Sequence, residues 1–218
     1  MIAGALPADM TRTTTSTTAA PKRPRTKSAE TRREELMDAA QVLFLEKGFD
    51  ATSVDEIVKR ADVAKGTFYF YFKTKDEVLQ ALRERFVDTF QERLEDAVSA
   101  RAPDDWIGRL DAWIESAIHG YLDAFALHDL VFHEFRPSNQ RRRAQHENPT
   151  MAQLTALVAG GAKAGAWVSR TPRLTAAMLF CAFHGAVDGD IVALTKTSRK
   201  RLITEVRAFC HGALGLLQ

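Results

Sequence analysis

The stretch AKGTFYFYFKTKDEV, residues 64–78, contains five consecutive aromatic residues, Phe68 to Phe72, with lysines on both sides. Aromatic side chains favour β-strands, and a run this apolar normally belongs to a core. No neighbouring segment alternates as a partner strand would, and a lone strand leaves its backbone polar groups without hydrogen bonds. A helix over residues 65–71 instead places Phe68 and Phe72 four positions apart on one face. The stretch is therefore predicted to contain a short helix.

Helices are also predicted on both sides of this segment. From Ser28 onward, apolar residues recur at steps of three and four, Thr31–Glu34 has the pattern of a capping box, and Gly48 is suited to end the helix. Ser53–Glu56 is a second capping box that opens a short helix, and Thr74–Glu77 is a third that opens a long one. Two short helices joined by a tight turn, the one opened by Ser53 and the one over residues 65–71, predict a helix-turn-helix, whose second helix enters the DNA major groove.

The outward side chains of this predicted helix suit DNA recognition. Lysine and threonine can donate hydrogen bonds to bases or phosphates, a glycine allows close backbone approach, and the flanking lysines supply charge. The residues predicted to contact DNA are Thr52, Ser53, Lys65, Gly66, Thr67, Tyr69, Phe70, Tyr71, Lys73 and Lys75. The competing interpretation, that all five aromatics are core, accounts for Phe68 and Phe72 but not for the three residues between them.

Residues 31–79, TRREELMDAAQVLFLEKGFDATSVDEIVKRADVAKGTFYFYFKTKDEVL, resemble the DNA-binding domain of the TetR family of transcriptional regulators. The matching landmarks are Thr31-Arg32, Ala39-Ala40, Phe44, Lys47-Gly48-Phe49, Thr52-Ser53, Ile57, Ala61, Val63, Lys65-Gly66-Thr67, Tyr69, Tyr71-Phe72 and Lys75. The sequence departs from the family pattern at Phe70, where the family varies, and at Ala64, where serine or threonine is frequent.

The resemblance implies an all-α homodimer of about nine helices. An N-terminal three-helix helix-turn-helix domain is expected over residues 28–73, with the recognition helix at about 65–71. A long helix is expected to join it to a C-terminal helical domain for ligand binding and dimerisation, so that connector and domain together occupy residues 74–218. Residues 1–27 are rich in Thr, Ser and Pro and basic, which predicts a disordered tail, either simply solvated or an arm that reaches DNA.

Charge and cysteine content limit the other possibilities. The formal net charge of +2 is too small by itself to indicate a nucleic-acid partner, so the distribution of charge has to decide. Arg141–Arg143 is a basic cluster, expected in an exposed loop or helix end or as a second DNA patch. Cys181 and Cys210, in apolar helical surroundings, are predicted to be reduced core thiols of a cytoplasmic protein. Neither a membrane-spanning run nor a secretory signal is recognisable, and no membrane partner is expected.

The C-terminal part is expected to bind a small hydrophobic or amphipathic effector among large side chains. The candidate ligand-binding residues are Trp113, His119, Phe132, Trp167, Phe183 and His184, although for any single one of them ordinary core is the favoured alternative. The last two long helices, residues 172–195 and 198–217, are predicted to form the dimer interface as a four-helix bundle with their symmetry mates. Its candidate residues are Gly185, Gly189, Leu202, Val206 and Phe209, with intramolecular core as the alternative.

The predicted function is a ligand-responsive transcriptional regulator, most simply a repressor, that binds a palindromic double-stranded DNA operator as a homodimer. No catalytic motif, metal site or cofactor site is recognisable in the sequence, so neither an enzyme activity nor a cofactor is expected. Two alternatives remain open: an all-helical enzyme or small-molecule carrier with a purely structural helix-turn-helix, and an architectural DNA-binding protein that responds to no ligand. The sequence leaves the effector, the operator and the regulated genes undetermined.

Overall fold

The computed structural model describes residues 28–134, 149–188 and 197–216, and these residues form an all-α fold. Within these ranges there are nine α-helices and one π-helix and no β-strand, which confirms the predicted fold class. The α-helices are α1 (Ala29–Lys47), α2 (Val54–Arg60), α3 (Lys65–Tyr71), α4 (Lys75–Ser99), α5 (Trp106–Asp123), α6 (Phe125–Asp129), α8 (Pro149–Lys163), α9 (Pro172–Val187) and α11 (Arg199–Ala213), and η1 (Leu130–Glu134) is the π-helix. The tail, Arg141–Arg143 and Gly189 lie outside the described residues.

Local sequence signals set the ends of the first helices. Ser28 is the N-cap of α1, and its hydroxyl accepts a hydrogen bond from the Thr31 amide at 3.1 Å. The predicted capping box at Thr31 is therefore wrong, because Thr31 already lies inside the helix. Gly48 ends α1 with a φ of +88°, a conformation that favours glycine, and its amide donates to the Phe44 carbonyl.

Helices α1 and α2 pack around Phe68 of α3 and Phe72, the C-cap residue of α3. Phe68 is 0% exposed and Phe72 is 3% exposed, and their ring centroids lie 6.0 Å apart, so the prediction that both belong to the core is confirmed. The partners in this core come from α1, α2 and α4 and include Leu36, Phe44, Ile57, Leu79 and Leu82. The first turns of α4 thus share the core of the helix-turn-helix, and the domain boundary at residue 73 stays a prediction.

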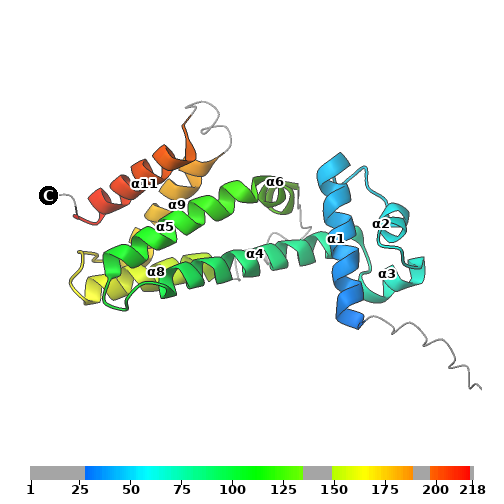
Figure 1. The fold of residues 1–218 in the computed structure, drawn as a ribbon, viewed down its shortest axis with the longest axis horizontal. Helices are drawn as coiled ribbons and strands as arrows, with labels where there is room; N and C mark the ends of the chain where they lie inside the picture. The colour runs from blue at the N-terminus through cyan, green and yellow to red at the C-terminus, as the bar shows by residue number, and fades with distance from the viewer. Residues whose placement is uncertain (1–27, 135–148, 189–196, 217–218) are drawn as a thin grey trace, which may run out of the picture.

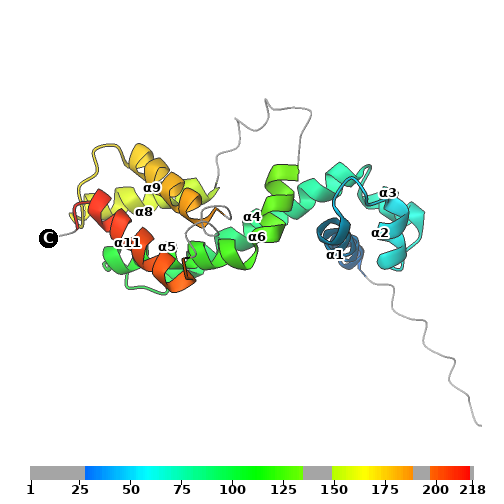
Figure 2. The same cartoon turned by 90° about the horizontal axis from the view of Figure 1, so that it is seen from above.

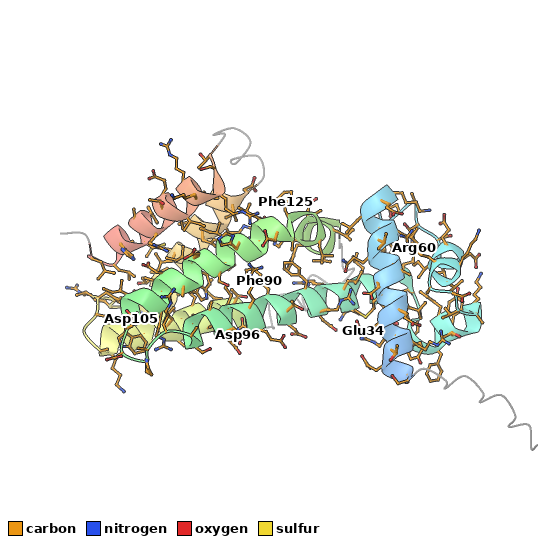
Figure 3. The ribbon with its side chains drawn as sticks, in the orientation of Figure 1. Glu34, Arg60, Phe90, Asp96, Asp105 and Phe125 are labelled. Atoms are coloured by element: carbon orange, nitrogen blue, oxygen red, sulfur yellow. The ribbon has the colours of Figure 1, made fainter. Side chains whose placement is uncertain are left out.

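Helix α4 connects this N-terminal unit to the rest of the molecule, as Figure 1 shows. Its 25 residues correspond to a length of about 37 Å. Arg85, halfway along α4, donates hydrogen bonds to α1 residues Glu34 at 2.7 Å, Asp38 at 2.8 Å and Gln41 at 2.9 Å. Glu34 faces α4 in Figure 3. These contacts hold α1 against the middle of α4.

The second half of α4 joins α5, α8, α9 and α11 in a helical bundle with its own core, seen from above in Figure 2. Phe90 lies between α4 and α5 in Figure 3, close to Gly120 of α5. Trp113 and Phe183 meet edge to face at 5.9 Å between their ring centroids. No helix in the described part of the chain is both long enough and apolar enough to cross a membrane.

Two predictions about the C-terminal part are corrected. Helix α9 ends at Val187, earlier than the predicted residue 195, because Asp188 adopts an extended conformation with ψ near 134°. Cys210 is buried as predicted, and burial raises the pKa of its thiol to about 12. Cys181 is exposed rather than buried, because it lies on the outer face of α9.

Candidate nucleic-acid interface

The face of α3 opposite its core phenylalanines is the most exposed aromatic surface of the N-terminal unit. Phe70 is 78% exposed and Tyr69 is 53% exposed, whereas Tyr71 is half-buried. The Phe70 ring meets the Tyr71 ring edge to face at 4.9 Å between centroids. The chain itself does not bury these large aromatic side chains. Exposed aromatic surface of this kind is typical of a surface that a binding partner covers.

Gly66 and Thr67 lie in the first turn of the same helix. Gly66 is exposed, and a Cβ atom added to it would meet no protein atom within 4 Å. Thr67 is half-buried, and its amide donates to the Ala64 carbonyl at 2.8 Å. The backbone at Gly66 is therefore open to a partner, as close approach to DNA requires, while the contact itself stays a prediction.

Lys65 at the start of α3 already has a partner in its own chain. Its ammonium lies 2.7 Å from the Asp55 carboxylate of α2, with both side chains largely exposed. The hydrogen bond to Asp55 raises the pKa of Lys65 above its ordinary value. A DNA phosphate would have to compete with Asp55 for this lysine. The sequence did not reveal this pair, because nothing in the spacing of two residues on different helices indicates a contact.

Ser53 and Glu56 form the predicted capping box at the start of α2. The Ser53 hydroxyl donates to the Glu56 carboxylate at 2.7 Å, and the Ser53 amide donates to the same carboxylate at 2.9 Å. A hydrogen bond from Lys47, followed by those from Ser53, lowers the pKa of Glu56 to about 2. The exposed Ser53 can therefore reach DNA only if its hydroxyl exchanges Glu56 for a phosphate.

The predicted DNA contact of the Thr52 side chain is wrong, because that side chain is only 2% exposed. Its hydroxyl donates to the carbonyls of Gly48 at 2.8 Å and of Leu43 at 3.3 Å. Thr52 thus ties the loop after α1 back onto the end of that helix. The sequence could not show this, since a threonine before an N-cap serves equally well at a surface or in a buried turn.

The two flanking lysines differ in their environments. Lys73 is exposed, and no described residue accepts a hydrogen bond from its ammonium, so it is available for a phosphate. Lys75 is half-buried, and its ammonium donates to the carbonyls of Phe49 at 2.8 Å and Thr52 at 2.5 Å, with Asp50 at 3.5 Å. The predicted phosphate contact of Lys75 is contradicted, because its donors are directed into the loop between α1 and α2.

Four of the six candidate ligand residues lie along one chain of aromatic rings. Trp113 contacts Phe183, Phe183 contacts His184, and His184 contacts His128, which stacks on Phe132 at 4.6 Å between ring centroids. Tyr121, Phe125 and Phe180 also belong to this cluster, and Phe86 of α4 contacts its His128 and Phe132. The cluster lies where α5, α6, η1 and α9 meet.

The other two candidates lie elsewhere. His119 is half-buried near Arg199, with its Nδ1 atom 3.2 Å from the guanidinium. Trp167 is buried, and its indole donates to the Val158 carbonyl at 2.9 Å. A role in the same ligand site as Phe183 is not supported for either residue.

The residues predicted to form the dimer interface differ in their burial. Leu202 and Val206 are buried in the core of their own chain, which favours the intramolecular alternative for both. Phe209 is 57% exposed, and Gly185 is exposed with no atom within 4 Å of an added Cβ. Helix α9 adds exposed side chains that the sequence did not single out, namely Leu174, Met178 and Cys181. With Gly185 these recur at steps of three and four, so they form one stripe, here called the α9 stripe.

No group of His, Cys, Asp and Glu side chains among the described residues is arranged to hold a metal ion.

Comparison with known proteins agrees with this geometry. The model of the family "Bacterial regulatory proteins, tetR family" matches residues 36–82. The fatty acid metabolism regulator protein of Bacillus subtilis (strain 168) is 37% identical over 68 residues, which cover 31% of this chain and 35% of that protein. The transcriptional repressor NemR of Escherichia coli (strain K12) is 37% identical over 62 residues, which cover 28% of this chain and 31% of NemR. The chain thus matches only about a third of the length of these two relatives.

A solved structure extends the similarity of fold to the C-terminal bundle. The transcriptional regulator FadR from Bacillus subtilis in complex with stearoyl-CoA superposes with a TM-score of 0.67 at 23% identity, covering 85% of this chain and 99% of that one. The local match lies on the helix-turn-helix, and the likeness in fold covers nearly all of the neighbour. The local match shows that residues 36–82 belong to the TetR family of bacterial regulatory proteins, and the likeness in fold extends over most of the chain.

Proposed function

We propose that this protein is a transcriptional repressor that binds a palindromic operator in double-stranded DNA as a homodimer. A small hydrophobic or amphipathic effector would release it. The proposal includes no catalytic activity and no cofactor, and it places the protein in the cytoplasm, where its DNA partner is. The observation that carries it is the exposed face of α3, where Gly66, Tyr69 and Phe70 lie open on a helix anchored by buried Phe68 and Phe72.

The chemistry of this face suits groove recognition. A helix inserted into the major groove reads base edges with its first residues and contacts the backbone at its margins. Gly66 and Thr67 lie at the start of α3, and exposed Lys73 follows its end. Phe70 offers an apolar surface that a thymine methyl group or a sugar can cover. Repression is favoured over activation because the relative NemR is a repressor.

Dimerisation is supported by the α9 stripe together with Phe209 of α11. Exposed apolar side chains along one helix face are typical of a self-complementary interface, in which each residue meets its symmetry mate or a neighbour. A two-fold dimer would place two α3 helices on successive turns of one face of DNA, about 34 Å apart. An operator with two inverted half-sites would follow from that symmetry.

The effector region of the proposal is the aromatic cluster around Tyr121 and Phe183. Burial, with Asp188 nearby, raises the pKa of Tyr121 above its ordinary value, and the protonated hydroxyl is a hydrogen-bond donor at neutral pH. Such a mixture of apolar rings and a few polar groups suits an amphipathic molecule. The similar FadR structure holds stearoyl-CoA, which favours a long-chain acyl compound as the first effector to test.

Transmission to DNA is proposed to run through α6, η1 and α4. His128 and Phe132 of the aromatic cluster stack on each other and both contact Phe86 of α4 edge to face, so a ligand that moves these rings also moves α4. A preference of the effector for one arrangement by about 1–3 kcal/mol changes operator affinity by roughly 5- to 150-fold.

Selection of bound DNA from a random pool tests the proposal. An inverted repeat is expected, and fatty acyl-CoA compounds and other hydrophobic molecules added to that complex should release it. Binding without sequence preference and without release would support the architectural alternative. A ligand that co-purifies with a protein that shifts no DNA would support the carrier or enzyme alternative.

A further inference from the structure

Lys75 joins two backbone segments of the N-terminal unit, the start of α4 and the loop between α1 and α2. It is the first residue of α4, and its ammonium reaches the loop between α1 and α2, more than twenty residues earlier in the chain. A lysine ammonium has three N–H donors, and three carbonyls lie within reach: Phe49 at 2.8 Å, Thr52 at 2.5 Å and Asp50 at 3.5 Å. The ammonium also lies 4.6 Å from the centroid of the Phe49 ring.

This position fixes the start of α2. The Thr52 amide donates to the Phe49 carbonyl at 3.2 Å, so the carbonyl that Lys75 holds also closes the turn before α2. Ser53, the N-cap of α2, follows directly. Charge-assisted hydrogen bonds to backbone carbonyls are stronger than neutral ones and direct the donor into the loop instead of toward solvent.

We infer that Lys75 is a positioning residue that clamps the loop before α2 onto the start of α4, and that it is not a phosphate contact. The DNA-binding part of this inference rests on the proposed function. Because α4 continues into the effector bundle, the clamp makes the start of α2 follow any displacement of the first turn of α4. The phosphate contact at this corner of the molecule then belongs to Lys73, whose side chain is exposed.

Lys75→Met in the full-length protein tests the clamp, because methionine keeps an apolar stem and removes the donors. Hydrogen exchange of the Thr52 amide, measured by NMR on the free protein, should accelerate about ten-fold or more, the equivalent of a charge-assisted hydrogen bond. Affinity for the selected operator should fall roughly 2- to 12-fold for each half-site, while the slope of log affinity against log salt stays as in the wild type.

Lys73→Met is the matched control. It should leave the Thr52 amide unchanged and reduce the magnitude of the salt slope by about 1.8 for the dimer, because each of the two subunits loses one phosphate contact worth about 0.9. Lys75→Arg should restore part of the Thr52 protection, since a guanidinium also donates to several carbonyls. Phe49→Leu removes the aromatic ring beneath the ammonium and keeps the N–H donors of Lys75. It should therefore accelerate exchange of the Thr52 amide less than Lys75→Met does.

Two results overturn the inference. One is a Lys75→Met protein whose salt slope flattens by about 1.8, as expected when each subunit of the dimer loses one phosphate contact. The other is unchanged exchange at Thr52 in both Lys75→Met and Phe49→Leu. If the wild-type protein selects no DNA at all, the proposed function fails, yet exchange at Thr52 in the free protein still decides whether the clamp exists.

Discussion

Replacing Gly66 with alanine tests whether the backbone of α3 lies against DNA. A Cβ atom added at this position meets nothing within 4 Å in the protein, and the residue is helical, so the change creates no internal clash. Alanine favours a helix over glycine by roughly 0.5–1 kcal/mol. In a chain of this size that gain corresponds to a rise in melting temperature of about 1–4 °C.

The effect on DNA binding should have the opposite sign. If the Gly66 backbone contacts the groove, the added methyl group overpacks that contact, at a cost of roughly 1–3 kcal/mol by analogy with overpacked cores. Operator affinity should therefore fall about 5- to 150-fold for each half-site. Fluorescence anisotropy with a labelled operator measures this loss, and circular dichroism on the same preparation measures the melting temperature.

The combination of a more stable protein and a weaker complex is specific to a residue at the DNA surface. Gly66→Leu should extend the trend, because a larger side chain enters the groove contact more deeply. Operator affinity that is unchanged in Gly66→Ala and Gly66→Leu would refute the placement of α3 in the groove. A fall in melting temperature would instead show that a side chain at position 66 clashes with other atoms of the protein.

Three further changes address stability and assembly. Gly161→Ala should lower the melting temperature by about 2–12 °C, because the added Cβ would lie 2.0 Å from the ring of buried Trp167 and overpacking costs roughly 1–3 kcal/mol; a melting curve like that of the wild type would contradict this. The pKa of Glu56 is lowered to about 2, mainly by the hydrogen bond from Lys47. The contribution of its carboxylate to folding stability is therefore complete above about pH 4.5 and is lost as the pH falls toward 2. Glu56→Gln should accordingly lose less stability than the wild type between pH 4.5 and 2 in thermal melts, and parallel pH profiles would argue against the pairing. Met178→Lys, at a 57% exposed position of the α9 stripe, should shift sedimentation velocity profiles toward the monomer at unchanged helicity; an intact dimer would remove the stripe from the interface.

The sequence by itself determined the helical class and the N-terminal unit. Helix starts and stops depend on a few adjacent residues, so Ser53, Gly48 and Thr74 could be placed from local patterns alone. The helical repeat also predicted which aromatic residues of the run are buried, because Phe68 and Phe72 lie four positions apart and must share a face. The exposure of Phe70 and Tyr69 followed in turn, since a seven-residue helix cannot bury every side.

Tertiary structure alone decided which polar side chains are free to meet a partner. Lys75 looked like Lys73 in the sequence, yet its ammonium is held by carbonyls more than twenty residues earlier. Thr52 looked like Ser53, yet its hydroxyl is buried against the end of α1. Hydrogen bonds of this kind depend on which distant segments the core brings together, and no local spacing records that.

The same reason explains the corrections in the C-terminal bundle. A helix that packs on two sides shows a broad apolar face in its sequence, and that face does not reveal which part meets the same chain and which part a second copy. Leu202 and Val206 therefore proved to be core residues, whereas Phe209 and Met178 are exposed. The sequence determined that these helices carry a broad apolar surface, and the packing of α5 and α9 against α11 decided which side of it remains uncovered.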